Sequence, residues 1–134
     1  MEKSAMGTIL LDVTPGLGEE FERSFLTRNG HAVMVCHGPH DDQPCPLLQG
    51  AGCATFDRAH GVVFELDLDR AEHRAIVERY RALRGPDFPI RVVISAAQAE
   101  HYATFLDEVE AWPEVPSAAE LDGFAAQVEA RDRG

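Results

Sequence analysis

The sequence predicts an α/β protein in which helices cover both faces of a parallel sheet, a three-layer α-β-α sandwich. The prediction rests on short apolar runs that alternate with amphipathic helical patterns along the chain. The runs are continuous, as is typical of strands buried on both faces. The chain has 134 residues, 45% of them hydrophobic and 26% charged, which suits one globular domain over 1–134.

The first half of the chain supplies two strands and one helix. Apolar runs predict strands at 8–11 and 32–35. Asn29 and Gly30 form a typical left-handed C-cap for a helix between these strands. Apolar residues recur at helical spacing on that helix: Leu17, Phe21 and Phe25.

A third strand is expected at 61–66, and a long helix follows it. Asp69 and Glu72 have the spacing of a capping box, which predicts the start of this helix. The helix should stop at Gly85, because Pro86 follows it. Its apolar face is formed by Ile76, Val77, Tyr80 and Leu83.

The last third of the chain predicts a fourth strand at 90–94 and a helix over about 97–110. Residues 109–112 fit either the end of that helix or a short fifth strand. Ser117 and Glu120 form a second capping box for the final helix. The apolar face of that helix comprises Leu121, Phe124, Ala125 and Val128.

The stretch 37–60 is rich in glycine, proline and aspartate, which interrupt helices and strands. It is therefore predicted to be a long structured loop with at most one short helix. Only 46–48 and 54–56 contain apolar residues suited to the core. A loop of this length in a compact domain is usually functional or mobile.

The charge balance excludes some partners. Lys and Arg number 12, Asp and Glu number 23, and the net charge is −11. Such a chain does not attract nucleic-acid phosphates or anionic membrane surfaces, so neither is expected as a partner. No apolar run approaches the roughly 18 residues of a membrane span. The N-terminus lacks the pattern of a signal peptide, so a cytoplasmic location is expected.

Four segments carry a resemblance to a known family: Gly30–Val33, Val62–Leu66, Pro89–Ala96 and Pro116–Leu121. In order and spacing they resemble the receiver domains of bacterial response regulators, over nearly the whole chain. The resemblance implies a flavodoxin-like fold with strand order 2-1-3-4-5. In such a fold the reactive edge lies beyond the carboxyl ends of the strands.

The residues expected at that edge depart from the family's phosphorylation site. Receivers carry an acidic pair after the first strand, and here the segment has a single acid, Asp12. Glu65 occupies the position of the acceptor aspartate, or Asp67 does so in a shifted register. Ser95 matches the family's switch residue. The family's lysine should precede Pro116, but the chain's only lysine is Lys3.

Phosphoryl transfer to a carboxylate needs a magnesium site beside the acceptor, and these substitutions predict a degenerate one. We therefore expect a stand-alone, atypical regulatory module that acts through protein contacts, without phosphorylation and without catalytic residues. Glu65 could imitate a constant negative charge or be only a partly solvated carboxylate. A conventional receiver phosphorylated at Asp67 is the competing interpretation.

The loop suggests another function. It concentrates thiol and imidazole groups that could hold zinc or an iron–sulfur cluster: Cys36, His37, His40, Cys45 and Cys53. Their C-x8-C-x7-C spacing matches neither a zinc knuckle nor a ferredoxin motif. A reversible thiol switch and a purely structural role remain open. The alternative function is therefore a redox or metal sensor.

The resemblance also implies a protein partner and a homodimer, the default symmetric oligomer. Receivers associate through their last helices and the strand between them. The corresponding surface would use the aromatic residues that remain exposed among Tyr102, Phe105, Trp112 and Phe124.

Overall fold

The computed structural model describes residues 8–13, 19–36, 45–50, 52–85, 87–106, 109–112 and 117–133. Five strands form one parallel sheet in the order β2-β1-β3-β4-β5. They are β1 (Thr8–Asp12), β2 (Ala32–Cys36), β3 (Gly61–Phe64), β4 (Ile90–Val93) and β5 (Glu110–Trp112). The predicted class and strand order are confirmed.

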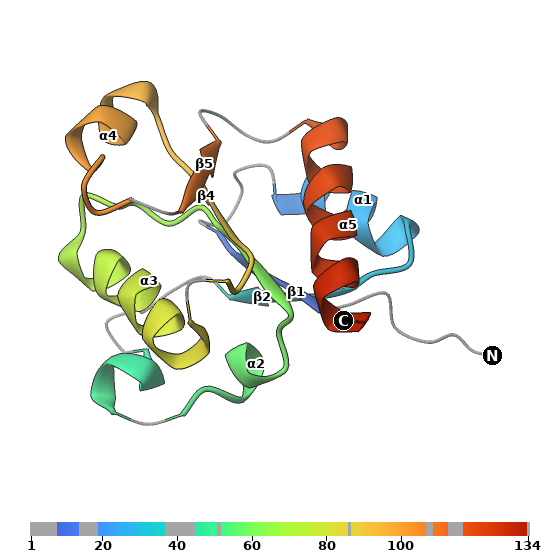
Figure 1. The fold of residues 1–134 in the computed structure, drawn as a ribbon, viewed down its shortest axis with the longest axis horizontal. Coiled ribbons are helices and arrows are strands. Elements are labelled where there is room, and N and C mark those ends of the chain that lie inside the picture. The colour runs from blue at the N-terminus through green and yellow to red at the C-terminus, as the bar shows by residue number, and fades with distance from the viewer. Residues whose placement is uncertain are drawn as a thin grey trace.

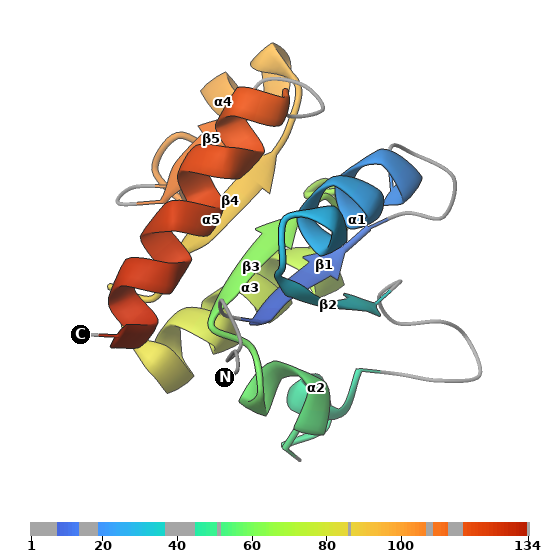
Figure 2. The ribbon, with the colours of Figure 1, turned by 90° about the vertical axis from the view of Figure 1, so that its right-hand side faces the viewer.

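Helices cover both faces of the sheet (Figures 1 and 2). One face carries α1 (Glu19–Arg28) and α5 (Ala118–Arg133). The other carries the 3-10 helix η1 (Pro46–Gln49), α2 (Ala54–Asp57), α3 (Ala71–Arg84) and α4 (Ala96–His101). Within the described residues, no helix combines the length and the apolar character needed to cross a bilayer.

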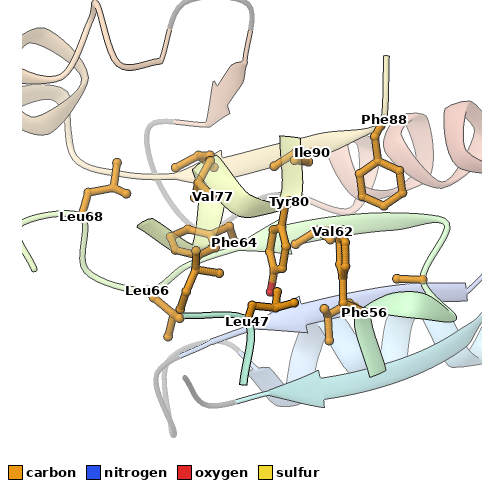
Figure 3. Packing of buried hydrophobic residues seen from close by; sticks show 14 of the residues in the cluster. Leu47, Phe56, Val62, Phe64, Leu66, Leu68, Val77, Tyr80, Phe88 and Ile90 are labelled. Atoms are coloured by element: carbon orange, nitrogen blue, oxygen red, sulfur yellow. The ribbon is translucent and has the colours of Figure 1, made fainter. Parts of the chain in front are cut away.

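The hydrophobic core has two parts because successive strand side chains point to opposite faces of the sheet. Leu10 packs into the cluster under α3, whereas its neighbours Ile9 and Leu11 pack under α1 and α5. The cluster under α3 contains Phe56 of α2 and Leu47 of η1 (Figure 3). These two residues come from the only parts of the 37–60 stretch that were expected to reach the core.

Three local predictions need correction. The 37–60 stretch contains two short helices, η1 and α2, where at most one was expected. The helix predicted over 97–110 ends at His101, and residues 102–106 form turns. The turns still bury Leu106 in the core. The apolar spacing is therefore compatible with the observed turns as well as with the predicted helix. Residues 110–112 form the fifth strand.

The third correction concerns the start of α3. Arg70 is the N-cap residue, and its side chain makes no capping hydrogen bond. The Glu72 carboxylate binds the Arg70 guanidinium at 2.7 Å instead, while Asp69 accepts the Tyr102 hydroxyl at 2.8 Å. The capping box at the start of α5 is confirmed: Ser117 and Glu120 exchange hydrogen bonds of 2.9 and 3.2 Å.

Gly61 begins β3 and lies close to side chains of α5. A Cβ atom at this position would lie 2.6 Å from Val128 Cγ2 and 3.1 Å from Phe124 Cζ. We expect Gly61→Ala to lower the free energy of unfolding by about 1–3 kcal/mol, because overpacking forces neighbouring side chains to shift. Urea denaturation measures the change. In the control Gly123→Ala the new methyl meets nothing within 4 Å, so an equal loss there would contradict this explanation.

Candidate functional site

The carboxyl edge of the sheet brings together several of the residues singled out from the sequence. Asp12 ends β1 and is paired in register with Cys36 at the end of β2. Glu65 follows β3, and its amide donates to the Asp12 carbonyl at 2.6 Å. Ser95 follows β4 at the N-cap of α4. The parallel topology alone accounts for this convergence, because all the strands end at the same edge.

Asp12 is enclosed in the protein and is already engaged. Its side chain is 1% exposed, and its Oδ2 accepts the Tyr80 hydroxyl at 2.6 Å. Burial raises the pKa of Asp12 to about 7, although hydrogen bonds from the Tyr80 hydroxyl and the Cys36 thiol lower it in part. Burial and the nearby Asp12 charge raise the pKa of Tyr80, which therefore remains a neutral donor.

Glu65 faces a second carboxyl group that sequence reasoning missed. Glu22 on α1 is completely buried. Burial raises the pKa of Glu65, and a hydrogen bond with Glu22 lowers it in part. Two carboxyl groups that meet in a buried place favour sharing one proton. Glu65 is therefore a poor imitation of a constant negative charge.

Asp67 and Ser95 belong to a separate network at the start of α4. The exposed Asp67 accepts the Asp69 amide at 2.9 Å and the Gln98 side-chain amide at 3.1 Å, both at Oδ1. The Ser95 hydroxyl accepts the Gln98 amide at 3.1 Å. Together with the Gln98 side chain this makes a capping box. Both predicted site residues thus stabilise local turns.

The carboxylates do not form the cation site that phosphoryl transfer needs. Across the described ranges, no three His, Cys, Asp or Glu side chains are grouped so that they could hold a metal ion. This applies to Asp12, Glu65 and Asp67, and also to the three cysteines. The residues present therefore do not fit magnesium at the edge of the sheet.

The three cysteines pack against the same core cluster, and one of them also caps a helix. Cys36, Cys45 and Cys53 are partly buried and carry no disulfide bond. All three pack against the core cluster under α3. Cys53 is the N-cap of α2, and its Sγ accepts the Phe56 amide at 3.5 Å. The predicted ligands His37 and His40 lie outside the described residues.

Two residues of the site, Tyr80 and Glu22, were not predicted. The sequence marked Tyr80 only as a member of an apolar helical face. The burial of Glu22 could have been predicted, because Glu22 precedes the buried Leu26 by one helical turn and lies on the same face of α1. A charged residue on a buried face is uncommon and often marks a site.

The expected aromatic contact surface is smaller in the structure. Trp112 and Phe124 are buried and pack edge to face with ring centroids 6.0 Å apart. Tyr102 and Phe105 are only partly buried. The Arg74 guanidinium lies over the Tyr102 ring, 5.4 Å from its centroid. The surface that remains is formed by Tyr102, Phe105 and their polar surroundings.

Comparison with solved structures places this fold among receiver domains. A CheY-like receiver domain protein from Methanospirillum hungatei matches with a TM-score of 0.64 and 15% identity, over 97% of this chain and 98% of that one. The Francisella response regulator 1452 receiver domain matches with a TM-score of 0.66 and 12% identity, over 94% and 98%. Brucella abortus NtrX matches with 0.63 and 15%, over 96% of this chain and 28% of NtrX.

No protein-family model matches the sequence, and no curated protein matches it significantly. At 12–15% identity the likeness to solved structures shows the fold. The chain therefore has the flavodoxin-like fold of response-regulator receiver domains, as the resemblance implied. At the carboxyl edge of its sheet, Asp12 accepts the Tyr80 hydroxyl and Ser95 caps α4.

Proposed function

We propose that the chain is an atypical, receiver-like regulatory module of the cytoplasm that acts through protein contacts and does not depend on phosphorylation. The fold supports the regulatory class, because receiver domains share it over nearly the whole chain. The observation that carries independence from phosphorylation is the buried Asp12 carboxylate, held by the Tyr80 hydroxyl at 2.6 Å. A carboxylate in this position is not available to a magnesium ion.

The remaining groups at the edge support the same proposal. Glu65 meets another carboxyl group, Asp67 is bound by the turn that precedes α3, and Ser95 caps α4. The sequence contains a single lysine, Lys3, and none near Pro116. The acidic and hydroxyl groups of the site are therefore engaged in other contacts, and the lysine that would pair with a bound phosphoryl group is missing from the segment before Pro116.

Incubation with acetyl phosphate and magnesium tests the proposal. We expect the intact mass of the protein to remain unchanged, while a receiver domain with a complete acidic site gains one phosphoryl group in parallel. The matched variants are Asp67→Asn and Asp69→Asn, which remove neighbouring exposed carboxylates of one turn. A phosphoryl gain that Asp67→Asn abolishes and Asp69→Asn retains would establish the conventional receiver instead.

The contact surface we propose includes Tyr102 and Phe105, which follow α4 and are only partly buried. Its polar rim is acidic at Asp69, whose carboxylate holds the Tyr102 hydroxyl. We propose a homodimer as the resting assembly. Light scattering of the purified chain measures its mass, and a monomer at micromolar concentration would contradict the dimer.

The alternative sensor function divides into two forms. The metal form depends on His37 and His40, which lie outside the described residues, and the three cysteines by themselves do not group as ligands. The thiol form would use Cys36, Cys45 and Cys53, which are partly buried and carry no disulfide bond.

A further inference from the structure

A groove lies between η1 and α3, which pack against each other on one face of the sheet (Figure 1). Its volume of about 460 Å³ falls within the range of roughly 300–1,000 Å³ that is typical of small-molecule sites. The lining residues are Leu47, Gly50, Ala75, Glu78, Arg79 and Ala82. Among the described residues, none from the candidate site at the sheet edge lines it, so the groove is a separate place for a ligand.

The apolar wall of this groove is formed by Leu47 of η1 and by Ala75 and Ala82 of α3. Leu47 is 2% exposed and belongs to the core cluster under α3. Ala75 and Ala82 lie about two helical turns apart on one face of the helix, and their methyl side chains leave the space beside Leu47 unfilled. Gly50 ends η1, and a Cβ atom there would meet nothing within 4 Å. The wall therefore has room for a short aliphatic group.

Two neighbouring side chains of opposite charge line the same groove. Glu78 is exposed and Arg79 is half-buried. Within the described part of the chain neither forms an ion pair, and the buried Nε of Arg79 has no hydrogen-bond partner. Other arginines of α3 are engaged inside the protein: Arg74 donates to the Leu68 carbonyl at 2.7 Å and Arg84 to the Phe56 carbonyl at 2.9 Å. Arg79 and Glu78 are therefore available to charged groups of a ligand.

The lining selects the charges of that ligand. A guanidinium pairs with a carboxylate through two parallel hydrogen bonds, which Arg79 can supply. A ligand with only a carboxylate would be repelled by Glu78, and one with only an ammonium group would be repelled by Arg79. A small zwitterion matches both side chains, because it carries the two charges on adjacent atoms.

We propose that the groove binds a free α-amino acid with an aliphatic side chain, such as leucine. Its carboxylate pairs with Arg79, its ammonium group pairs with Glu78, and its side chain packs on the apolar wall. The ligand bridges η1 and α3, so it stabilises the folded protein. This inference goes beyond the proposed docking function and does not depend on it, since amino-acid binding is measured without any protein partner.

The test is a titration of the isotope-labelled full chain with L-leucine, up to the solubility of the amino acid, followed by NMR of the backbone amides. We expect saturable shifts at residues 47–50 and 75–82. Isocaproate lacks the ammonium group and isoamylamine lacks the carboxylate, so each should bind at least about threefold more weakly than leucine. The absence of saturable shifts in these segments, or equal binding of isocaproate, would overturn the proposal.

Variants separate the two charges. Arg79→Gln should weaken leucine binding about tenfold or more and remove the preference for leucine over isoamylamine. Glu78→Gln should remove the preference for leucine over isocaproate. The matched control Arg23→Gln makes the same change of charge at an exposed position of α1 and should bind leucine as the wild type does. An Arg79→Gln variant that binds leucine with wild-type affinity, or an Arg23→Gln variant that loses as much affinity, would contradict the site.

A last variant tests the groove itself. Ala82 is exposed, so Ala82→Leu can extend over the apolar wall while both charges remain. It should abolish the leucine-induced shifts, and circular dichroism verifies that the variant is folded. Unchanged leucine binding in folded Ala82→Leu would show that the amino acid binds elsewhere.

Discussion

We expect Phe56→Ala to lower the free energy of unfolding by about 3–5 kcal/mol, the range for truncation of a fully buried phenylalanine. Phe56 is 1% exposed. Its ring stacks on Tyr80 with centroids 4.2 Å apart and meets Phe88 edge to face at 5.5 Å. The Arg84 guanidinium covers the ring and donates to the Phe56 carbonyl at 2.9 Å. Urea denaturation followed by circular dichroism measures the loss.

The matched control is Phe21→Ala on α1, which removes an aromatic ring that is 47% exposed. That variant should lose about 1 kcal/mol or less, because most of its ring is already in water. Equal losses in the two variants would mean that α2 does not anchor the 45–60 segment to α3.

The free energy of unfolding should fall by about 2–3 kcal/mol between pH 5 and pH 8, with Asp12 as the main cause. Burial raises the pKa of Asp12 from 3.8 to about 7. Well below pH 3.8 the carboxyl is protonated in both the folded and the unfolded state, so its contribution to stability is complete. As the pH rises toward 7, the unfolded chain releases this proton first, and the folded state loses stability relative to it.

Asp12→Asn should remove most of this pH dependence, because the amide oxygen still accepts the Tyr80 hydroxyl and carries no charge. Denaturation at pH 5 and pH 8 of both proteins measures the difference. Glu65→Gln measures the contribution of the second carboxyl separately, since burial also raises the pKa of Glu65 and acts in the same direction. If the free energy of unfolding of Asp12→Asn fell between pH 5 and pH 8 as much as that of the wild type, the Asp12 carboxylate would be ionised without penalty in the folded protein.

Apolar periodicity predicted four of the strands and most of the core, although Phe21 and Leu83 on the expected apolar faces are exposed. The strand order followed from the family resemblance and not from periodicity. The continuous runs at Ile9–Leu11 and Val62–Phe64 are central strands, since only such strands bury side chains on both faces. The capping box of Ser117 and Glu120 was predictable for a related reason. Both partners lie within one helical turn, so no tertiary contact is needed to form the pair.

The centre of the site was not predictable in the same way. Asp12 and Tyr80 are 68 residues apart, and helical spacing reports only that Tyr80 faces the core, not which group accepts its hydroxyl. Asp69 and Glu72 failed for a comparable reason. The Tyr102 hydroxyl, 33 residues away, takes the Asp69 carboxylate, and the neighbouring Arg70 guanidinium takes that of Glu72. A partner from across the fold therefore decided the role of Asp69, and a competing local ion pair decided that of Glu72.

The ring of Tyr80 reaches from the one-turn helix α2 to the interior strand β1. Its face stacks on Phe56 of α2, and its hydroxyl donates to Asp12. The position of α2 and the pKa of Asp12 are therefore coupled through one side chain. A partner that displaced the helix would change how tightly Asp12 holds its proton. By thermodynamic reciprocity, acidity would then alter the affinity for that partner to the same extent.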